Sequence, residues 1–188
     1  MSETKNRTRT LVECGLMIAM ATVLSYIPIF EMPMGGSITL CSTVPLVIVS
    51  FRHGLKWGLF TGGVHGVIQT MLGFKNVLYC TTILSMAGCV LLDYFLAYMV
   101  VGASCVFGKG LRNRSAGVAV GTMATGLLRY LCSFLSGILI WGGYAPEGTP
   151  VWVYSLTYNG SFMVPEIVLT TVAAVVVMRL VVRRPTHA

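Results

Sequence analysis

Asp93, Arg129 and Glu166 each lie near the middle of a long apolar stretch of this sequence. A charged side chain at the centre of a membrane costs about 3 kcal/mol or more, so such residues normally bind a ligand, conduct ions or form an ion pair. We interpret Arg129 and Glu166 as a structural ion pair that holds the later helices together. Asp93 is interpreted as a residue that contacts a ligand.

Arg129 begins a stripe of residues spaced by four, which continues with Ser133, Gly137 and Trp141. On a helix this spacing places all four on one face. The small Gly137 would leave a hollow between a hydroxyl group and a large aromatic ring, which suits a flat heteroaromatic ligand. The alternative is an ordinary helix-packing face, with Trp141 in the aromatic belt at the membrane surface.

The last apolar stretch begins with Tyr154, Tyr158 and Asn159. Together they offer aromatic faces, hydroxyl groups and a carboxamide that both donates and accepts hydrogen bonds. An aromatic belt needs no asparagine, so this group favours a binding site. His65 and Gln69, four residues apart, could line the same cavity from another helix, although we interpret His65 as a buried, hydrogen-bonded histidine and not as a metal ligand.

Gly15 and Ala19 form a small-residue face on the first apolar stretch. Small residues four apart let another helix approach closely. That helix could belong to a partner subunit or to the same bundle, and the spacing does not choose between them.

The sequence contains no P-loop, nucleophile elbow or metal-ligand spacing, which predicts no catalytic residues, no metal and no cofactor. If ATP hydrolysis drives this protein, the ATPase must be a different subunit. The six cysteines have no paired spacing, so we expect buried thiols and no disulfide framework.

These residues must be positioned by helices in a membrane. The chain has 188 residues, of which 55% are hydrophobic and 10% are charged, and its mean hydropathy is +0.80. This composition lies outside that of soluble domains. A spanning helix needs about 20 apolar residues. We therefore expect an all-α integral membrane bundle of six helices, with residues 1–188 forming a single transmembrane domain.

Glycine, proline and charged residues divide the apolar sequence into six predicted spans. The second span is short and contains Pro45, so we expect it to be tilted, broken or partly re-entrant. The predicted spans are residues 10–30, 38–51, 56–72, 77–107, 115–141 and 151–182.

Basic residues are distributed unevenly between the two sides that these spans imply. With both termini in the cytoplasm, eleven Lys and Arg residues fall on the cytoplasmic side and Lys75 alone falls on the outer side. The positive-inside rule explains this asymmetry, and the net charge of +7, without a nucleic-acid partner. Two loops, residues 31–37 and 142–150, would then cover an outward-facing pocket. The cytoplasmic set is Lys5, Arg7, Arg9, Arg52, Lys56, Lys109, Arg112, Arg114, Arg179, Arg183 and Arg184.

Short motifs of polar and glycine residues occur in a distinctive order along the chain. They are Gly35-Gly36-Ser37, Pro45, Phe51-Arg52-His53-Gly54, Leu92-Asp93-Tyr94, Arg129-Tyr130, Phe134-Leu135-Ser136-Gly137 with Trp141, Tyr144-Ala145-Pro146-Glu147-Gly148, the segment from Tyr154 to Ser161, and Pro165-Glu166. This set resembles the thiamine transporter family of substrate-binding components (S components) of energy-coupling-factor (ECF) transporters. The block from Arg129 to Glu166 is its most specific part.

The resemblance implies a six-helix substrate-binding bundle without catalytic activity. It would capture thiamine at its outer side and dock on a transmembrane coupling subunit that is driven by two ATPase subunits. Ligand contacts are implied for Asp93, Tyr94, Trp141, Tyr154 and Asn159. The chemistry agrees, because the thiazolium cation of thiamine suits a carboxylate and an aromatic face, and its aminopyrimidine suits a carboxamide.

Gly15 and Ala19 match the small residues of the docking face in this family. Ser133 departs from the family pattern, which commonly has a histidine facing the ligand at this position. One alternative is therefore a different small heteroaromatic ligand, such as a pyrimidine precursor of thiamine. Another is a self-sufficient carrier coupled to protons through Asp93 or Glu166, although the sequence lacks the internal repeat common in such carriers.

Overall fold

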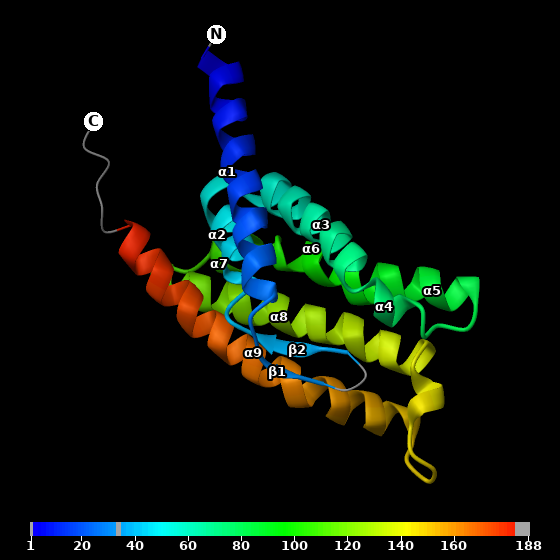
Figure 1. Cartoon of the computed structure of the whole chain (residues 1–188). Coiled ribbons are helices and arrows are strands. Elements are labelled where there is room, and N and C mark those ends of the chain that lie inside the picture. The colour runs from blue at the N-terminus through cyan, green and yellow to red at the C-terminus, as the bar shows by residue number, and fades with distance from the viewer. Residues whose placement is uncertain (1, 33–34, 183–188) are drawn as a thin grey trace.

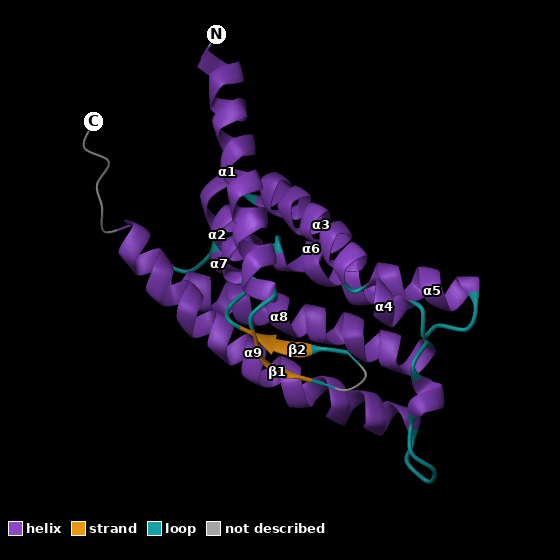
Figure 2. Ribbon diagram, in the orientation of Figure 1, coloured by secondary structure: helices purple, strands orange, loops and turns teal. Residues whose placement is uncertain are grey.

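The computed structural model describes residues 2–32 and 35–182, with side chains described within 6–32 and 35–180. The described chain is a bundle of helices with one short β-hairpin that lies along the last helix (Figures 1 and 2). The predictions for Arg183 and Arg184, and for the middle of the loop 31–37, lie outside the described residues.

The first helix, α1 (Ser2–Ser25), ends before the predicted span does. The chain then forms an antiparallel hairpin of β1 (Pro28–Glu31) and β2 (Ser37–Thr39). In the turn, Gly35 and Gly36 have φ angles of 92° and 93°, a conformation that favours glycine. The prediction that residues 10–30 form one helical span is therefore wrong at its end, because Pro28 has no N–H to continue a helix.

Helices α2 (Val44–His53) and α3 (Leu55–Leu72) are separated only by Gly54. Gly54 has a φ of 86° and redirects the chain between them. Pro45 lies in the first turn of α2, where its missing N–H leaves no hydrogen bond unmade. The second predicted span is thus a short, buried helix that starts six residues later than expected.

Residues 77–107 do not form one continuous helix as we predicted, because the membrane-length segment within them is only Ile83–Val101. Helix α4 (Phe74–Val77) is a single turn, and α5 (Ile83–Cys89) begins at a capping box made by Thr82 and Ser85. α5 continues through the π-helix η1 (Val90–Leu96) into α6 (Ala97–Val101), and α7 (Ser104–Gly108) follows a break. Asp93 lies within η1.

Helices α8 (Arg114–Leu139) and α9 (Val151–Val182) run antiparallel and side by side (Figure 1). Asn113 caps the start of α8, since its side-chain oxygen accepts hydrogen bonds from the backbone of Ser115 and Ala116. A 3-10 turn, η2 (Gly142–Tyr144), lies in the connection between the two helices.

Within the part of the chain that the structure describes, four helical segments are long and apolar enough to cross a membrane. Helix α2 is apolar but shorter, and α3 has 18 residues. The six predicted spans therefore correspond to four long helices together with the adjacent pair α2 and α3. The four long segments are Asn6–Ser25, Ile83–Val101, Arg114–Leu139 and Val151–Leu180.

Glycines let the backbones of α3 and α6 touch. A Cβ atom on Gly58 would overlap the carbonyl oxygen of Gly102, and a Cβ on Gly62 would lie 2.5 Å from that of Tyr98. Gly58 and Gly62 are four residues apart and so share one face of α3. Beside this contact lies an apolar core that includes Leu46 of α2.

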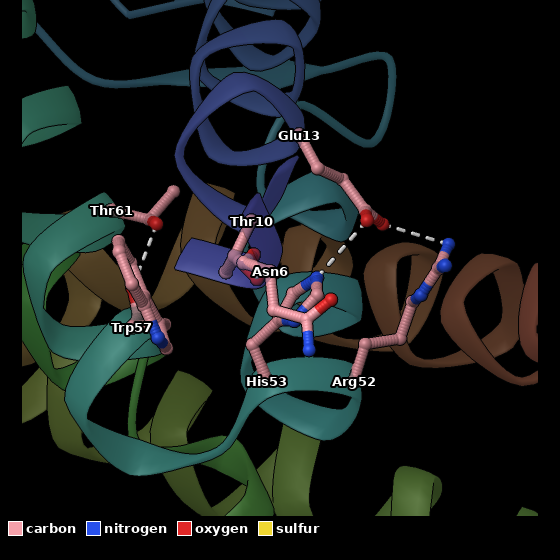
Figure 3. Close-up of polar contacts among 7 residues, drawn as sticks. All are labelled: Asn6, Thr10, Glu13, Arg52, His53, Trp57 and Thr61. Atoms are coloured by element: carbon pink, nitrogen blue, oxygen red, sulfur yellow. Dashed lines mark hydrogen bonds and ion pairs between the residues drawn. The ribbon is translucent and has the colours of Figure 1, made fainter. Parts of the chain in front are cut away.

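A charged contact joins α1 to the end of α2 (Figure 3). One oxygen of Glu13 lies 2.8 Å from Arg52 Nη1, and the other lies 3.1 Å from His53 Nε2. Both partners belong to the last turn of α2, so a single carboxylate fixes α1 against that helix.

The helix ends that carry basic residues gather on one side of the molecule. The start of α8, the end of α9 and the junction of α2 with α3 lie on this side, whereas α4 and the loop after α8 lie on the other (Figure 1). Arg52, Lys56, Arg114 and Arg179 belong to the first set, and Lys75 belongs to the second. The separation agrees with the predicted sidedness, and the assignment of the basic side to the cytoplasm stays a prediction.

Candidate ligand-binding site

A cavity of about 230 Å³ lies between the hairpin, η1 and the facing ends of α8 and α9, away from the basic side of the bundle. The fold brings all eight residues that we predicted as ligand contacts to its wall. Their shared position at the cavity is observed in the structure, whereas their contact with a ligand stays a prediction. They are Asp93, Tyr94, Ser133, Gly137, Trp141, Tyr154, Tyr158 and Asn159.

Asp93 is held at the cavity wall by two hydrogen bonds to the same oxygen, Oδ2. Ser136 Oγ donates over 2.5 Å and Trp141 Nε1 donates over 3.1 Å. The carboxylate is therefore fixed by α8 and by the residue two positions beyond its end. Asp93 and its neighbour Tyr94 both reach the cavity from η1, and π-helical turns of this kind often occur at functional sites.

Aromatic rings form two groups on the wall of the cavity. Trp141 and Tyr144 have ring centroids 5.8 Å apart with planes tilted by 44°. On α9, Tyr154 and Tyr158 lie 5.6 Å apart, and Tyr158 meets Phe162 edge-on at 6.2 Å. Flat faces on both sides of a cavity suit an aromatic or cationic guest.

Asn159 has its amide nitrogen engaged within the protein. Nδ2 donates to the carbonyl of Ser155 over 3.0 Å and to that of Ser133 over 3.3 Å. With the donor held by these carbonyls, the side-chain oxygen is the part of Asn159 suited to accept a bond from a ligand.

Gly137 lines the cavity and also serves helix packing. A Cβ atom at this position would overlap the Ser155 hydroxyl, which donates to Phe134 O over 2.8 Å. Gly137 therefore packs α8 against α9 and also borders the cavity, and its contact with a ligand stays a prediction.

Tyr94 is tied to the start of α4. Its hydroxyl group donates to Gly73 O over 3.1 Å and accepts from Asn76 Nδ2 at 3.4 Å. Because the hydroxyl has these partners, the ring of Tyr94 is its main contribution to the cavity.

Arg129 and Glu166 do not form the ion pair that we predicted. The Arg129 guanidinium lies over the ring of Tyr98, 4.7 Å from its centroid, and Nη2 is 3.4 Å from the Tyr98 hydroxyl. A cation–π contact of this kind stabilises a partly desolvated arginine without a carboxylate. Arg129 also lines the ligand cavity, and both residues border a second, much smaller cavity.

Glu166 is 4% exposed and bonds to the hairpin instead. Its Oε2 accepts from the backbone N–H of Thr39, and its Oε1 accepts from the Thr39 hydroxyl, each over 2.8 Å. Because Thr39 supplies donors to both oxygens, the carboxylate of Glu166 is satisfied without Arg129.

Sequence patterns did not identify several residues of the site. Asn76 and Phe162 line the cavity, and no sequence pattern marks them. Ser136, which donates to Asp93, lies one position away from the predicted stripe. Gln69 does line the cavity, as suggested, and donates to Ser25 Oγ over 2.7 Å.

His65 is fully buried, as we expected of a structural histidine. Its ring nitrogens lie 3.5 Å from Thr22 Oγ1 and 3.4 Å from Gln69 Nε2. Its ring also meets Tyr98 edge-on at 4.9 Å.

The face of α1 that contains Gly15 and Ala19 is exposed. A Cβ atom added to Gly15 would have no neighbour within 4 Å. The described residues of the bundle therefore leave this face uncovered, which removes the interpretation that Gly15 packs within the bundle.

Among the described residues, no three His, Cys, Asp or Glu side chains are grouped so that they could hold a metal ion. The six cysteines are free thiols.

The family profile described as "Thiamine transporter protein (Thia_YuaJ)" matches residues 11–186. The chain belongs to this thiamine transporter protein family. It is 33% identical to the thiamine transporter ThiT of Bacillus subtilis over 183 residues, which cover 92% of this chain and 91% of the relative. It is 30% identical to ThiT of Lacticaseibacillus paracasei over 190 residues, covering 89% of this chain and 86% of the relative.

Two solved structures share the fold of this family member. A structure of ThiT from Listeria monocytogenes superposes with a TM-score of 0.76 at 23% identity, over 93% of this chain and 96% of that chain. A structure described as the S component of a bacterial ECF transporter gives a TM-score of 0.57 at 15% identity, over 95% of each chain. The thiamine transporter family and the apolar helices together make this chain a multi-pass protein of the cell membrane.

Proposed function

We propose that this chain captures thiamine at the outer face of the cell membrane and delivers it to an ATP-driven ECF complex. Residues 1–188 would act as one substrate-binding domain without catalysis of its own. The observation that carries the proposal is the pairing of Asp93 with Trp141, through a 3.1 Å hydrogen bond, on the wall of a cavity in a member of the thiamine transporter family.

Each predicted contact has a role in this proposal. Asp93 attracts the cationic ligand, and the ring of Trp141 stacks against it. Asn159 accepts a hydrogen bond from the aminopyrimidine, while Tyr154 and Tyr158 cover the opposite face. The remaining contacts shape the wall: Tyr94 by its ring, Ser133 by its hydroxyl group and Gly137 by its lack of a side chain.

Equilibrium dialysis of the purified protein with labelled thiamine tests the proposal. We expect saturable binding and quenching of tryptophan fluorescence, because the ligand would lie against Trp141. Mass spectrometry of small molecules released from the denatured protein gives an independent identification.

A pyrimidine precursor of thiamine is the second candidate ligand, because Ser133 replaces an imidazole with a smaller hydroxyl group. Binding of the precursor without binding of thiamine would select this candidate. Addition of the two ligands in competition distinguishes a true preference from weak binding of both.

Delivery requires partner subunits: a transmembrane coupling subunit and two ATPase subunits. We propose that the coupling subunit docks on the exposed face of α1 at Gly15 and Ala19. Replacement of both residues by Trp should leave thiamine binding intact and abolish assembly and ATP-driven uptake. Uptake that continues without any coupling subunit or ATPase would instead identify a self-sufficient carrier, and its pH dependence would then be measured.

A further inference from the structure

The connection between β2 and α2, residues 39–43, is joined to α9 at two points. Thr39 donates twice to Glu166, each time over 2.8 Å. One helical turn along α9, Thr170 Oγ1 lies 3.4 Å from Thr43 Oγ1. All four residues are less than 8% exposed. A buried carboxylate with both oxygens bonded to one residue is a strong anchor, because hydrogen bonds to charged groups are stronger than those between neutral groups.

The backbone between these two points is strained. Cys41 has a φ of 58°, in the left-handed region that residues other than glycine seldom adopt. Such a conformation persists only where the surrounding contacts impose it. The bonds from Glu166 and Thr170 on either side of Cys41 are contacts of this kind.

The bond to Glu166 also sets the direction of the next hydrogen bond. Thr39 has one hydroxyl proton, and it is directed to Glu166 Oε1. In the 2.7 Å contact between Thr39 Oγ1 and Ser42 Oγ, Ser42 must therefore be the donor. Since Ser42 lines the ligand cavity, its oxygen presents lone pairs there and not a proton.

The same anchor fixes the hairpin that forms one wall of the cavity. Gly35, Gly36, Ser37 and Thr39 all line the cavity. The turn is held at its other end by Tyr158, whose hydroxyl donates to Gly35 O over 3.0 Å.

We propose that Glu166 is a positioning residue for ligand binding. Through Thr39 it fixes the hairpin wall of the cavity, and because Ser42 then donates its proton to Thr39, Ser42 can only accept a hydrogen bond from the ligand. Glu166 does not itself line the ligand cavity, so its effect on the ligand is indirect. The inference rests on the proposed function, with thiamine as the ligand. It assigns Glu166 to retention of the ligand and not to the Arg129 ion pair or to proton coupling.

The test compares Glu166→Gln and Thr39→Val with two controls. Thr39→Val removes the hydroxyl group at nearly constant shape, whereas Thr39→Ser retains it. Thr170→Val alters the second contact of α9 with residues 39–43, which lies outside the ligand cavity. Thiamine dissociation from each folded variant is followed by stopped-flow tryptophan fluorescence, with thermal unfolding measured beside it.

We expect thiamine to dissociate roughly tenfold faster from Glu166→Gln and from Thr39→Val, because each variant loses a hydrogen bond that the Glu166 carboxylate accepts in the wild type. The double variant should be little worse than either single one, since both changes break the same contact. Thr39→Ser, which keeps the hydroxyl group, should release thiamine more slowly than Thr39→Val, and Thr170→Val should stay within about twofold of the wild type. A merely structural role would lower the unfolding temperature of all variants and leave the dissociation rate of the folded fraction unchanged, which would overturn the proposal.

Hydrogen exchange on the ligand-free protein separates this inference from the proposed function. Exchange of the peptide that contains residues 35–42 should be faster in Glu166→Gln and unchanged in Thr170→Val. If the wild type fails to bind thiamine, the proposed function is wrong, and this exchange comparison still decides whether Glu166 holds the hairpin. Equal exchange in the wild type and Glu166→Gln would refute the anchoring role whatever the ligand is.

Discussion

Glycines pack against different kinds of atoms in the two halves of the bundle, the basic side and the region around the cavity. On the basic side they face backbone: Gly58 lies against Gly102, and Gly108 lies against Gly117. Around the cavity they face side chains instead. Gly36 lies against the ring of Phe162, and the ring and hydroxyl of Tyr94 cover Gly73.

This difference predicts that the two halves tolerate substitution of their glycines to different degrees. A backbone carbonyl fixed in a helix cannot move away from an added methyl group without shifting the whole helix, whereas a side chain can rotate. The basic half is therefore the rigid frame of the molecule. The cavity half can adjust its wall, which suits a part that must admit and release a ligand.

The largest expected effect is on stability, at the contact between α3 and α6. We expect Gly62→Leu to prevent folding or to lower the free energy of unfolding by about 3 kcal/mol or more, because the new side chain would meet the backbone at Tyr98. Thermal unfolding and size-exclusion chromatography in detergent measure this. Gly15→Leu is the matched control, since an added Cβ there meets nothing, and this variant should fold and bind thiamine normally.

The next effect is on affinity, at the cavity. Asp93→Asn should weaken thiamine binding about 10- to 100-fold, because it removes the charge that attracts the cationic ligand. The fold should survive, since an amide oxygen can still accept from Ser136 and Trp141. Titration by fluorescence quenching should show a smaller loss for Glu166→Gln, and an equal or larger loss in that variant would reverse the two assigned roles.

The smallest effects are expected from two glycine-to-alanine substitutions, one in each half of the bundle. Gly62→Ala should cost about 1–3 kcal/mol of stability, whereas Gly73→Ala should cost less than about 1 kcal/mol, because Tyr94 can turn aside. Since that movement breaks the bond from Tyr94 to Gly73 O, Gly73→Ala should instead weaken thiamine binding a few-fold. Equal losses of stability in the two variants would contradict the division into a rigid half and an adjustable half.

Local sequence patterns predicted the membrane bundle and much of the cavity wall. Apolar runs and basic flanks are properties of short segments, and they located the four long helices and the shorter pair α2 and α3 to within a few residues at most ends. The spacing of four on α8 marked Ser133 and Gly137, and the aromatic start of α9 marked Tyr158. The resemblance to the family implied the other contacts, which are Asp93, Tyr94, Trp141, Tyr154 and Asn159. The fold brings all eight predicted contact residues to the wall of one cavity.

Tertiary structure alone decided the partners of the buried charges. Glu166 and Thr39 are 127 positions apart, and a threonine in an apolar sequence gives no sign that it will donate to a carboxylate. Charge favoured Arg129 as the partner of Glu166, yet Arg129 lies over Tyr98. The sequence did not predict the hairpin either, because its register depends on pairing across a turn and on contacts with α9. Segment chemistry fixes which groups enter the membrane, but which donor meets which acceptor depends on packing between distant segments, where several partners of similar chemistry compete and geometry chooses among them.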